Sequence, residues 1–235
     1  PMTDVAFPHG LRQELVDIAC DLETYVRYLK RLGLTGFPVS DAPRHITVPQ
    51  EAGSPEDTLE LIRRNLDGCR RCGLHEGRKN IVFGSGNPQA SLVLVGEGPG
   101  YEEDLQGLPF VGPAGQLLTK ILKAIDLTRD EVYICNIVKC RPPGNRNPER
   151  QEIECCFPFL RRQISAIRPK LICAMGNIAA QTLLETDMPI SRLRGEFHKF
   201  GDIPLMPTYH PAFLLRNPEK KRDVWQDVQK IRASL

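Results

Sequence analysis

A pair of cysteines at metal-binding spacing is the first feature of this sequence that points to chemistry. Cys69 and Cys72 form a Cys-x-x-Cys, in which two thiolates can bind one metal centre. The chain holds eight cysteines and shows no basic-then-apolar leader, so we do not expect a disulfide framework. Reduced cysteines fill a core, bind a metal or act in catalysis. Spacing alone leaves the metal open, because zinc accepts four thiolates as readily as iron–sulfur clusters do.

A glycine-rich loop is the second chemical feature. Gly96 to Gly100 contains three glycines and a proline, which predicts a tight turn, and the loop continues to Phe110. A phenylalanine in such a loop is either a hydrophobic plug or a surface on which a planar base stacks. The loop lacks the Lys-Ser/Thr of a Walker loop and the glycine spacing of a dinucleotide fingerprint, which excludes both of those phosphate sites.

Three polar side chains adjoin apolar segments, where a binding site would need them. Glu97 follows the first segment, Asn136 lies within the second, and His210 precedes Pro211 after the last. An amide offers both a donor and an acceptor to an imide edge. Histidine can donate to an oxygen that gains negative charge. Asn136 as a turn residue and His210 as a helix cap are the simpler alternatives.

The elements that must position these residues follow an alternating pattern. Apolar runs at 91–95, 132–138, 171–175 and 203–206 predict four strands. Helices are predicted over 114–125, 149–167, 176–184 and in a region from 210 to 235. This order predicts an α/β fold, a three-layer α/β/α arrangement around a mostly parallel four-stranded sheet. Ligands of such sheets bind outside the carboxyl ends of the strands, where the special loops lie.

The N-terminal part has a different pattern. Apolar residues at helical spacing predict an amphipathic helix over 11–34, which carries Cys20, and four prolines mark 36–55 as a linker. Ser54 and Pro55 then resemble the start of a helix that leads to Cys69. We therefore divide the chain into an N-terminal helical extension with its linker, 1–55, and a main domain, 56–235.

Composition and charge narrow the classes of function. The chain is 41% hydrophobic and 26% charged, as in ordinary soluble globular proteins, and no apolar run approaches the ~20 residues of a membrane span. Residues 1–60 carry a net charge of −5 and the remainder carries +7. A basic main domain is compatible with a polyanionic partner, although many proteins of similar charge never bind nucleic acid.

Three motifs, in this order, carry a family resemblance. They are Gly96-Glu97-Gly98-Pro99-Gly100 with Gly107-Leu108-Pro109-Phe110-Val111-Gly112, Asn136-Ile137-Val138-Lys139-Cys140-Arg141-Pro142-Pro143, and His210-Pro211-Ala212-Phe213-Leu214-Leu215-Arg216. Over about residues 66–235 the chain resembles family 4 uracil-DNA glycosylases, the iron–sulfur, thermophile-type enzymes. The resemblance implies a base excision repair enzyme that flips uracil from single- or double-stranded DNA, hydrolyses the N-glycosidic bond and leaves an abasic site. We expect a monomer in the cytoplasm of a bacterium or archaeon.

The resemblance also implies a 4Fe–4S cluster. Its ligands would be Cys69, Cys72, Cys140 and Cys156. Cys155, next to Cys156, is an alternative ligand, whereas Cys135 and Cys173 are predicted to fill the core. The arginines that flank these thiols should favour the thiolate form; they are Arg70, Arg71 and Arg141.

The same resemblance assigns roles in the pocket. Phe110 would stack on uracil, Asn136 would read its edge, and His210 would hold a carbonyl oxygen. The N–H of Gly98 would point into the pocket, and Glu103 would exclude the methyl group of thymine. Glu97 would position water or stabilise the sugar cation. In the sister family 1, an aspartate serves the water where this chain has Gly98, so we do not expect a simple general-base mechanism.

Contacts with the DNA strand complete the expectation. Leu214, Leu215 and Arg216 would form a wedge that fills the space of the flipped nucleotide. The alternative is an amphipathic helix that packs at least one of the two leucines inward. Arg141 and Arg146 would contact phosphates. One alternative is a crosslinking relative, which would need a histidine in the basic loop; residues 141–148 contain none. The other alternative is a non-enzymatic iron–sulfur protein that binds nucleic acid.

Overall fold

The computed structural model describes residues 58–235. The predicted helix at 11–34, the linker at 36–55, Ser54 and Cys20 lie outside the described residues, and the domain boundary after residue 55 stays a prediction. The helix that leads to Cys69 is α2 (Leu59–Leu66), and its N-cap is Thr58, not the predicted Ser54. The Thr58 hydroxyl oxygen accepts a hydrogen bond of 3.2 Å from the Leu61 N–H, which satisfies a free amide of the first turn.

A six-stranded sheet forms the centre of the described part, in the order β1-β3-β2-β4-β6-β5. The four predicted strands form its parallel body: β2 (Leu92–Gly96), β3 (Tyr133–Asn136), β4 (Leu171–Met175) and β6 (Ile203–Thr208). Two short antiparallel strands, β1 (Ser85–Gly86) and β5 (His198–Phe200), extend its edges. The sequence did not predict them, because two or three residues are too few to show a period.

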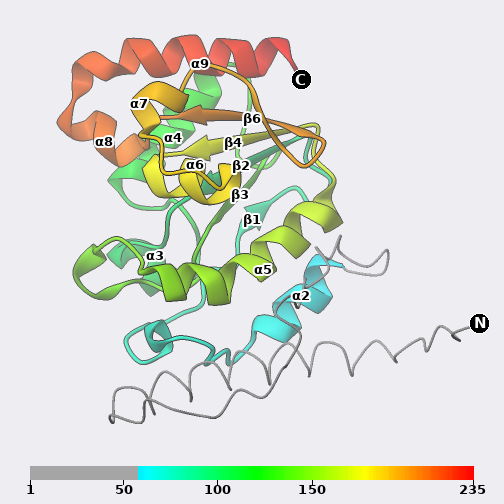
Figure 1. The fold of residues 1–235 in the computed structure, drawn as a ribbon, viewed down its shortest axis with the longest axis vertical. Helices are drawn as coiled ribbons and strands as arrows, with labels where there is room; N and C mark the ends of the chain where they lie inside the picture. The colour runs from blue at the N-terminus through cyan, green and yellow to red at the C-terminus, as the bar shows by residue number, and fades with distance from the viewer. Residues whose placement is uncertain (1–57) are drawn as a thin grey trace, which may run out of the picture. The chain divides into compact units, whose positions relative to one another are not determined.

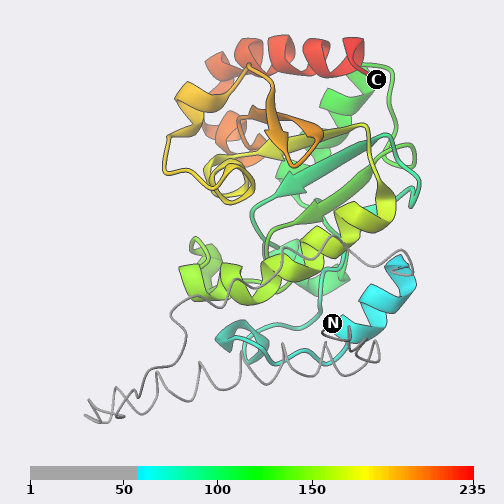
Figure 2. The same ribbon diagram turned by 45° about the vertical axis from the view of Figure 1, so that its right-hand side comes forward.

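Helices cover both faces of this sheet, which confirms the three-layer α/β/α fold (Figures 1 and 2). Side chains of β2 alternate between the faces. Val93 and Val95 join the core beneath α5 (Arg150–Ile167) and α6 (Asn177–Leu184). Leu92 and Leu94 join the core beneath α4 (Pro113–Ala124) and α9 (Lys221–Ala233). Burial on both faces explains why the parallel strands are wholly apolar.

Shorter elements surround these layers. They are α3 (Tyr101–Gln106), α7 (Ile190–Leu193), α8 (Pro211–Arg216) and the 3₁₀ turns Gly73–His75, Pro143–Asn145 and Pro218–Lys220. The helical region predicted from 210 to 235 is broken at Asn217, because the following Pro218 disfavours helical backbone in the residue before it. None of the helices in residues 58–235 is long and apolar enough to cross a membrane.

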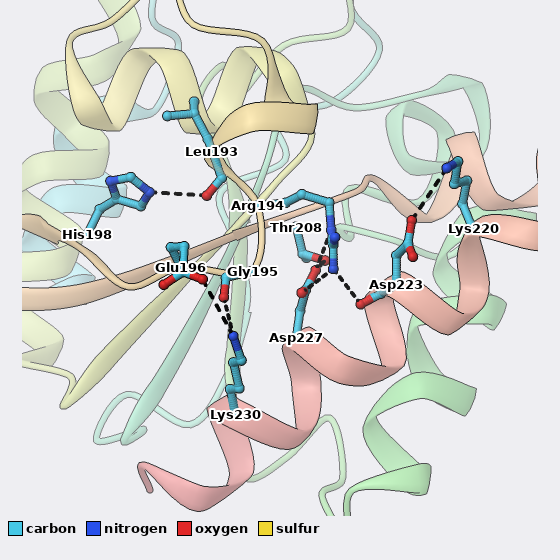
Figure 3. A network of polar contacts seen from close by, with 10 residues as sticks. All are labelled: Leu193, Arg194, Gly195, Glu196, His198, Thr208, Lys220, Asp223, Asp227 and Lys230. Atoms are coloured by element: carbon cyan, nitrogen blue, oxygen red, sulfur yellow. Dashed lines mark hydrogen bonds and ion pairs between the residues drawn. The ribbon is translucent and has the colours of Figure 1, made fainter.

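A buried polar network fixes the end of β6 to α9 (Figure 3). Asp227 on α9 accepts hydrogen bonds from the Thr208 hydroxyl, at 2.6 Å, and from Nε of Arg194, at 3.1 Å. Arg194 also donates to the backbone carbonyl of Asp223, at 2.7 Å. Because Thr208 stands two residues before His210, this network holds in place the strand end that carries the histidine.

Candidate active site

The residues after the parallel strands line a cavity of about 580 Å³. Carboxyl ends of parallel strands meet at one edge of a sheet, and this is where the sequence placed a ligand site. Nine of the eleven residues predicted for catalysis, uracil binding and DNA contact line it: Glu97, Gly98, Glu103, Phe110, Asn136, Arg146, His210, Leu215 and Arg216. The structure thus gathers residues more than 100 positions apart in the sequence into one cavity.

Two side chains converge on Gly96, at the end of β2. A Cβ atom on this residue would lie 2.5 Å from Oδ1 of Asn136 and 2.6 Å from Cζ of Phe110. Asn136 is 1% exposed, and its Oδ1 has no hydrogen-bond partner among the described residues. An unsatisfied buried acceptor costs about 1–3 kcal/mol. The amide oxygen is therefore available to a donor on a molecule that enters the cavity.

His210 presents a neutral imidazole. Its Nδ1 accepts a hydrogen bond of 3.1 Å from the Ala212 N–H, so the ring proton is on Nε2. Burial lowers the pKa of His210 to about 4, which keeps the ring neutral at physiological pH. The ring centroid lies 5.4 Å from that of Phe110. Nε2–H is thus a neutral donor beside the aromatic ring.

The loop that carries Phe110 is held by Glu103. One carboxylate oxygen accepts hydrogen bonds of 2.9 Å from the N–H groups of Val111 and Gly112. The other accepts one of 3.2 Å from the N–H of Gly100. Glu103 lines the cavity as predicted, but its oxygens are engaged by these three amides. Its contribution to excluding a methyl group stays a prediction.

Glu97 and Gly98 form the floor next to β3. Burial raises the pKa of Glu97. A Cβ at Gly98 would approach Cγ2 of Val138 to 2.8 Å, so a side chain here would require Val138 to move. The absence of a simple general-base mechanism stays a prediction.

The predicted wedge is corrected in one residue. Leu215 is 47% exposed and Arg216 is exposed, and both line the cavity. Leu214 is 1% exposed and packs into the core beneath α4 and α9. Its prediction as a DNA contact is wrong, because consecutive helical residues point about 100° apart and Leu214 takes the inward side.

The two basic residues predicted to contact phosphates differ in their surroundings. Arg146 is held by two hydrogen bonds to Glu152, of 2.8 and 2.6 Å, at the rim of the cavity. Arg141 does not line the cavity; its Nε donates to Oδ1 of Asn145 at 2.7 Å, and its guanidinium lies 5.1 Å from the centre of the Tyr101 ring. Their contacts with DNA stay predictions.

The four cysteines predicted as ligands lie in one neighbourhood. Burial raises the pKa of Cys72 to about 11, and the nearby Cys140, Cys155 and Cys69 raise it further. Burial likewise raises the pKa of Cys156 to about 12, and Cys140 and Cys72 add to the rise. The Cys140 sulfur accepts a hydrogen bond from Nη1 of Arg78 at 3.2 Å, and the Cys156 sulfur accepts one from the Lys139 N–H at 3.3 Å. The thiol of Cys72 has a backbone hydrogen bond with Leu74.

The cysteine set corrects one expectation and confirms another. The prediction that nearby charges favour the thiolate form is wrong for Cys72 and Cys156, because burial raises the pKa of both thiols. Cys135 and Cys173 are buried in the sheet, as predicted. Within residues 58–235, no three His, Cys, Asp or Glu side chains are close enough together to hold a single metal ion.

Sequence reasoning missed a buried lysine behind the cavity. Lys139 is fully buried, and its Nζ donates to the backbone carbonyl of Asn136 at 2.8 Å and to Oε1 of Gln163 at 2.6 Å. Gln163 in turn donates to the carbonyl of Phe83 at 3.0 Å. The sequence indicated its burial only by placing a single charged residue, Lys139, between Val138 and Cys140. Lys139 anchors the backbone that presents the Asn136 amide.

Comparisons with known proteins identify the family of this chain. The family model of the Uracil DNA glycosylase superfamily matches residues 83–229. A type-4 uracil-DNA glycosylase of Sulfurisphaera tokodaii is 44% identical over 185 residues, which cover 75% of this chain and 84% of the relative. Those of Archaeoglobus fulgidus and Thermotoga maritima are 44% and 42% identical, over 74% and 77% of this chain and 92% and 96% of the relatives. The chain therefore belongs to the uracil-DNA glycosylase superfamily, and within it to the type-4 family.

Proposed function

We propose that the cavity at the carboxyl edge of the sheet receives the uracil that this DNA repair enzyme flips out of DNA. The observation that carries the proposal is the buried, unpartnered Oδ1 of Asn136. Uracil supplies what this atom lacks, because its N3–H is a donor. The amide N–H₂ of the same side chain can donate to the neighbouring O4. Cytosine presents an acceptor at N3 and an amino group beside it, so the same contacts fail.

Stacking and leaving-group stabilisation follow from the neighbouring rings. Phe110 provides the face on which the uracil ring stacks. Hydrolysis breaks the bond between N1 of uracil and C1′ of the sugar, and the electron pair goes to the base while water adds to C1′. The Nε2–H of His210 donates to the uracil oxygen as negative charge develops there. A neutral donor suits this role because it retains its proton throughout.

Glu97 acts on the sugar side of the broken bond. As the base departs with the electron pair, C1′ gains positive charge, which a carboxylate stabilises. Partial burial strengthens this interaction, because the effective dielectric constant is low. Gly98 offers no second acid, so the water is held by Glu97 or by backbone groups.

DNA contacts surround the mouth of the cavity. The exposed Leu215 and the adjacent Arg216 fill the gap left by the flipped nucleotide. Arg141 and Arg146 contact phosphates of single- or double-stranded DNA. The monomeric state and the cytoplasmic location stay predictions.

Cys69, Cys72, Cys140 and Cys156 are proposed to hold a 4Fe–4S cluster. The proximity of these cysteines supports the proposal, since Cys69 and Cys140 raise the pKa of Cys72, and Cys140 and Cys72 raise that of Cys156. Hydrogen bonds to the sulfurs of Cys140 and Cys156 support it further. Each of these four residues would supply one thiolate to the cluster. When bound, the cluster supplies structural cross-linking and no electron, since glycoside hydrolysis transfers none. Ligation by Cys69 and Cys156 would tie the segment of Cys69 to α5.

Replacing Asn136 tests uracil recognition. We expect Asn136→Ala to lower uracil excision by about 100-fold or more, because a site built to hydrogen-bond its substrate loses both contacts. Binding to an undamaged duplex should be unchanged. Excision is measured on a uracil-containing oligonucleotide, and Asn87→Ala, in the loop after β1, is the control. Excision by Asn136→Ala equal to that of the parent protein would refute the assignment.

The pH profile of kcat/KM tests the two titrating groups. Burial raises the pKa of Glu97, so the kcat/KM of the parent protein should fall as the pH drops through a value above the ordinary 4.5. Glu97→Gln should lower the maximum kcat/KM and abolish this acidic fall. His210, with a pKa of about 4, should add no step near the ordinary 6.5. A limb near pH 6.5 that disappears in His210→Asn contradicts the neutral donor.

The adjacent cysteines of α5 offer a matched test of the cluster. We expect the purified protein to be brown and to contain iron and acid-labile sulfide in equal amounts. Cys156→Ser should lose both, whereas Cys155→Ser should keep them, as read by elemental analysis and visible absorption. A colourless protein that holds zinc overturns the cluster. Loss of iron in Cys155→Ser with retention in Cys156→Ser reverses the ligand assignment.

A further inference from the structure

Arg129 grips the backbone of the loop that carries Phe110. It lies in the turn between α4 and β3. Its Nη1 donates to the carbonyl oxygen of Phe110 at 3.0 Å, and its Nη2 donates to that of Pro109 at 2.8 Å. The guanidinium is partly buried, and burial lowers its pKa. One planar side chain therefore bridges two consecutive carbonyls.

The loop backbone that Arg129 holds has an unfavourable conformation at Phe110. Phe110 has a φ of +54°, in the left-handed region that costs a residue with a side chain roughly 1–2 kcal/mol. The carbonyl of Phe110 also presses against α4, since a Cβ at Gly115 would lie 1.8 Å from its oxygen. Such a conformation persists only where its surroundings hold it.

Glu103 and Arg129 hold this loop from opposite sides. Arg129 takes the carbonyls of residues 109 and 110, and Glu103 takes the amides of residues 111 and 112. The two charges are near enough for Glu103 to raise the pKa of Arg129, as Asp130 also does. Four consecutive residues are thus fixed by a cation on the carbonyl side and an anion on the amide side.

We propose that Arg129 is a positioning residue for uracil binding, which it serves by fixing the Phe110 ring beside Asn136 and His210. This rests on the proposed stacking role of Phe110. Arg129 does not line the cavity, and its Nη1 and Nη2 donate to the loop carbonyls, so it would act on the base through Phe110. A planar fork is required, since the single ammonium group of lysine cannot span two carbonyls with the same geometry.

A stacking ring contributes equally to the bound substrate and to the transition state. Its displacement should therefore raise KM and the inhibition constant of free uracil, with little change in kcat. We expect Arg129→Met to raise the inhibition constant of uracil about five- to tenfold, the range of an aromatic stacking contact. Arg129→Lys should still raise the inhibition constant of uracil, by more than half of the logarithmic increase that Arg129→Met causes.

A double-mutant cycle separates positioning from a general structural role. Phe110→Ala alone should raise the inhibition constant of uracil at least as much as Arg129→Met does. In the Phe110→Ala background, Arg129→Met should change it less than about twofold, because the group that Arg129 positions is already absent. Arg64→Met, at an exposed arginine paired with Glu60 on α2, is the control that should match the parent protein.

The outcomes of this cycle are distinct. If Phe110→Ala leaves the inhibition constant unchanged, the proposed stacking role itself fails. If Phe110→Ala weakens uracil binding and Arg129→Met does not, the positioning role alone is overturned. Independent, additive losses in the double variant also overturn it, since Arg129 would then act without Phe110. An inhibition constant in Arg129→Lys equal to that of the parent protein refutes the requirement for a planar guanidinium. Thermal melting of every variant verifies that it is folded.

Discussion

The absence of a side chain at Gly96 is the constraint on which the site depends. Oδ1 of Asn136 and the ring of Phe110 both occupy space that a Cβ atom would fill. One of these side chains comes from the end of β3 and the other from a loop fourteen residues after Gly96. The parallel pairing of β2 with β3 sets Gly96 opposite Asn136. A single missing methyl group thus lets an amide and an aromatic face meet at the carboxyl edge of the sheet.

The rest of the fold offsets the strain and desolvation that this meeting creates. A buried amide oxygen without a partner and a left-handed phenylalanine are both unfavourable in the free protein. Lys139 stabilises the backbone of Asn136 from behind, and Glu103 and Arg129 stabilise the loop of Phe110. The N–H of Lys139 also bonds the sulfur of Cys156, so the cysteine region and the base pocket share one residue.

The sequence predicted the apolar strands and the family motifs. It did not predict the side-chain contacts that depend on how distant segments pack together. Runs such as 171–175 and the motif of His210 led directly to β4 and to the cavity. The edge strands β1 and β5 are too short to show an alternating apolar pattern. The buried Leu214 could be told from the exposed Leu215 only by knowing which side of α8 packs inward. Arg129 was missed because its acceptors at 109 and 110 are backbone carbonyls, and Lys139 because its acceptors are the carbonyl of Asn136 and the distant Gln163 side chain. Burial, invisible to spacing, also reversed the expected effect on the cysteine thiols.

The most direct test of the account is to analyse the products formed from an oligonucleotide with one uracil and from matched oligonucleotides with cytosine or thymine. Free uracil should be released, and the strand should stay intact until alkali cleaves it at the abasic site. The cytosine and thymine substrates should yield no free base. Absence of uracil release, strand scission before alkali, or equal release of cytosine would contradict an Asn136 pocket that selects uracil for hydrolysis.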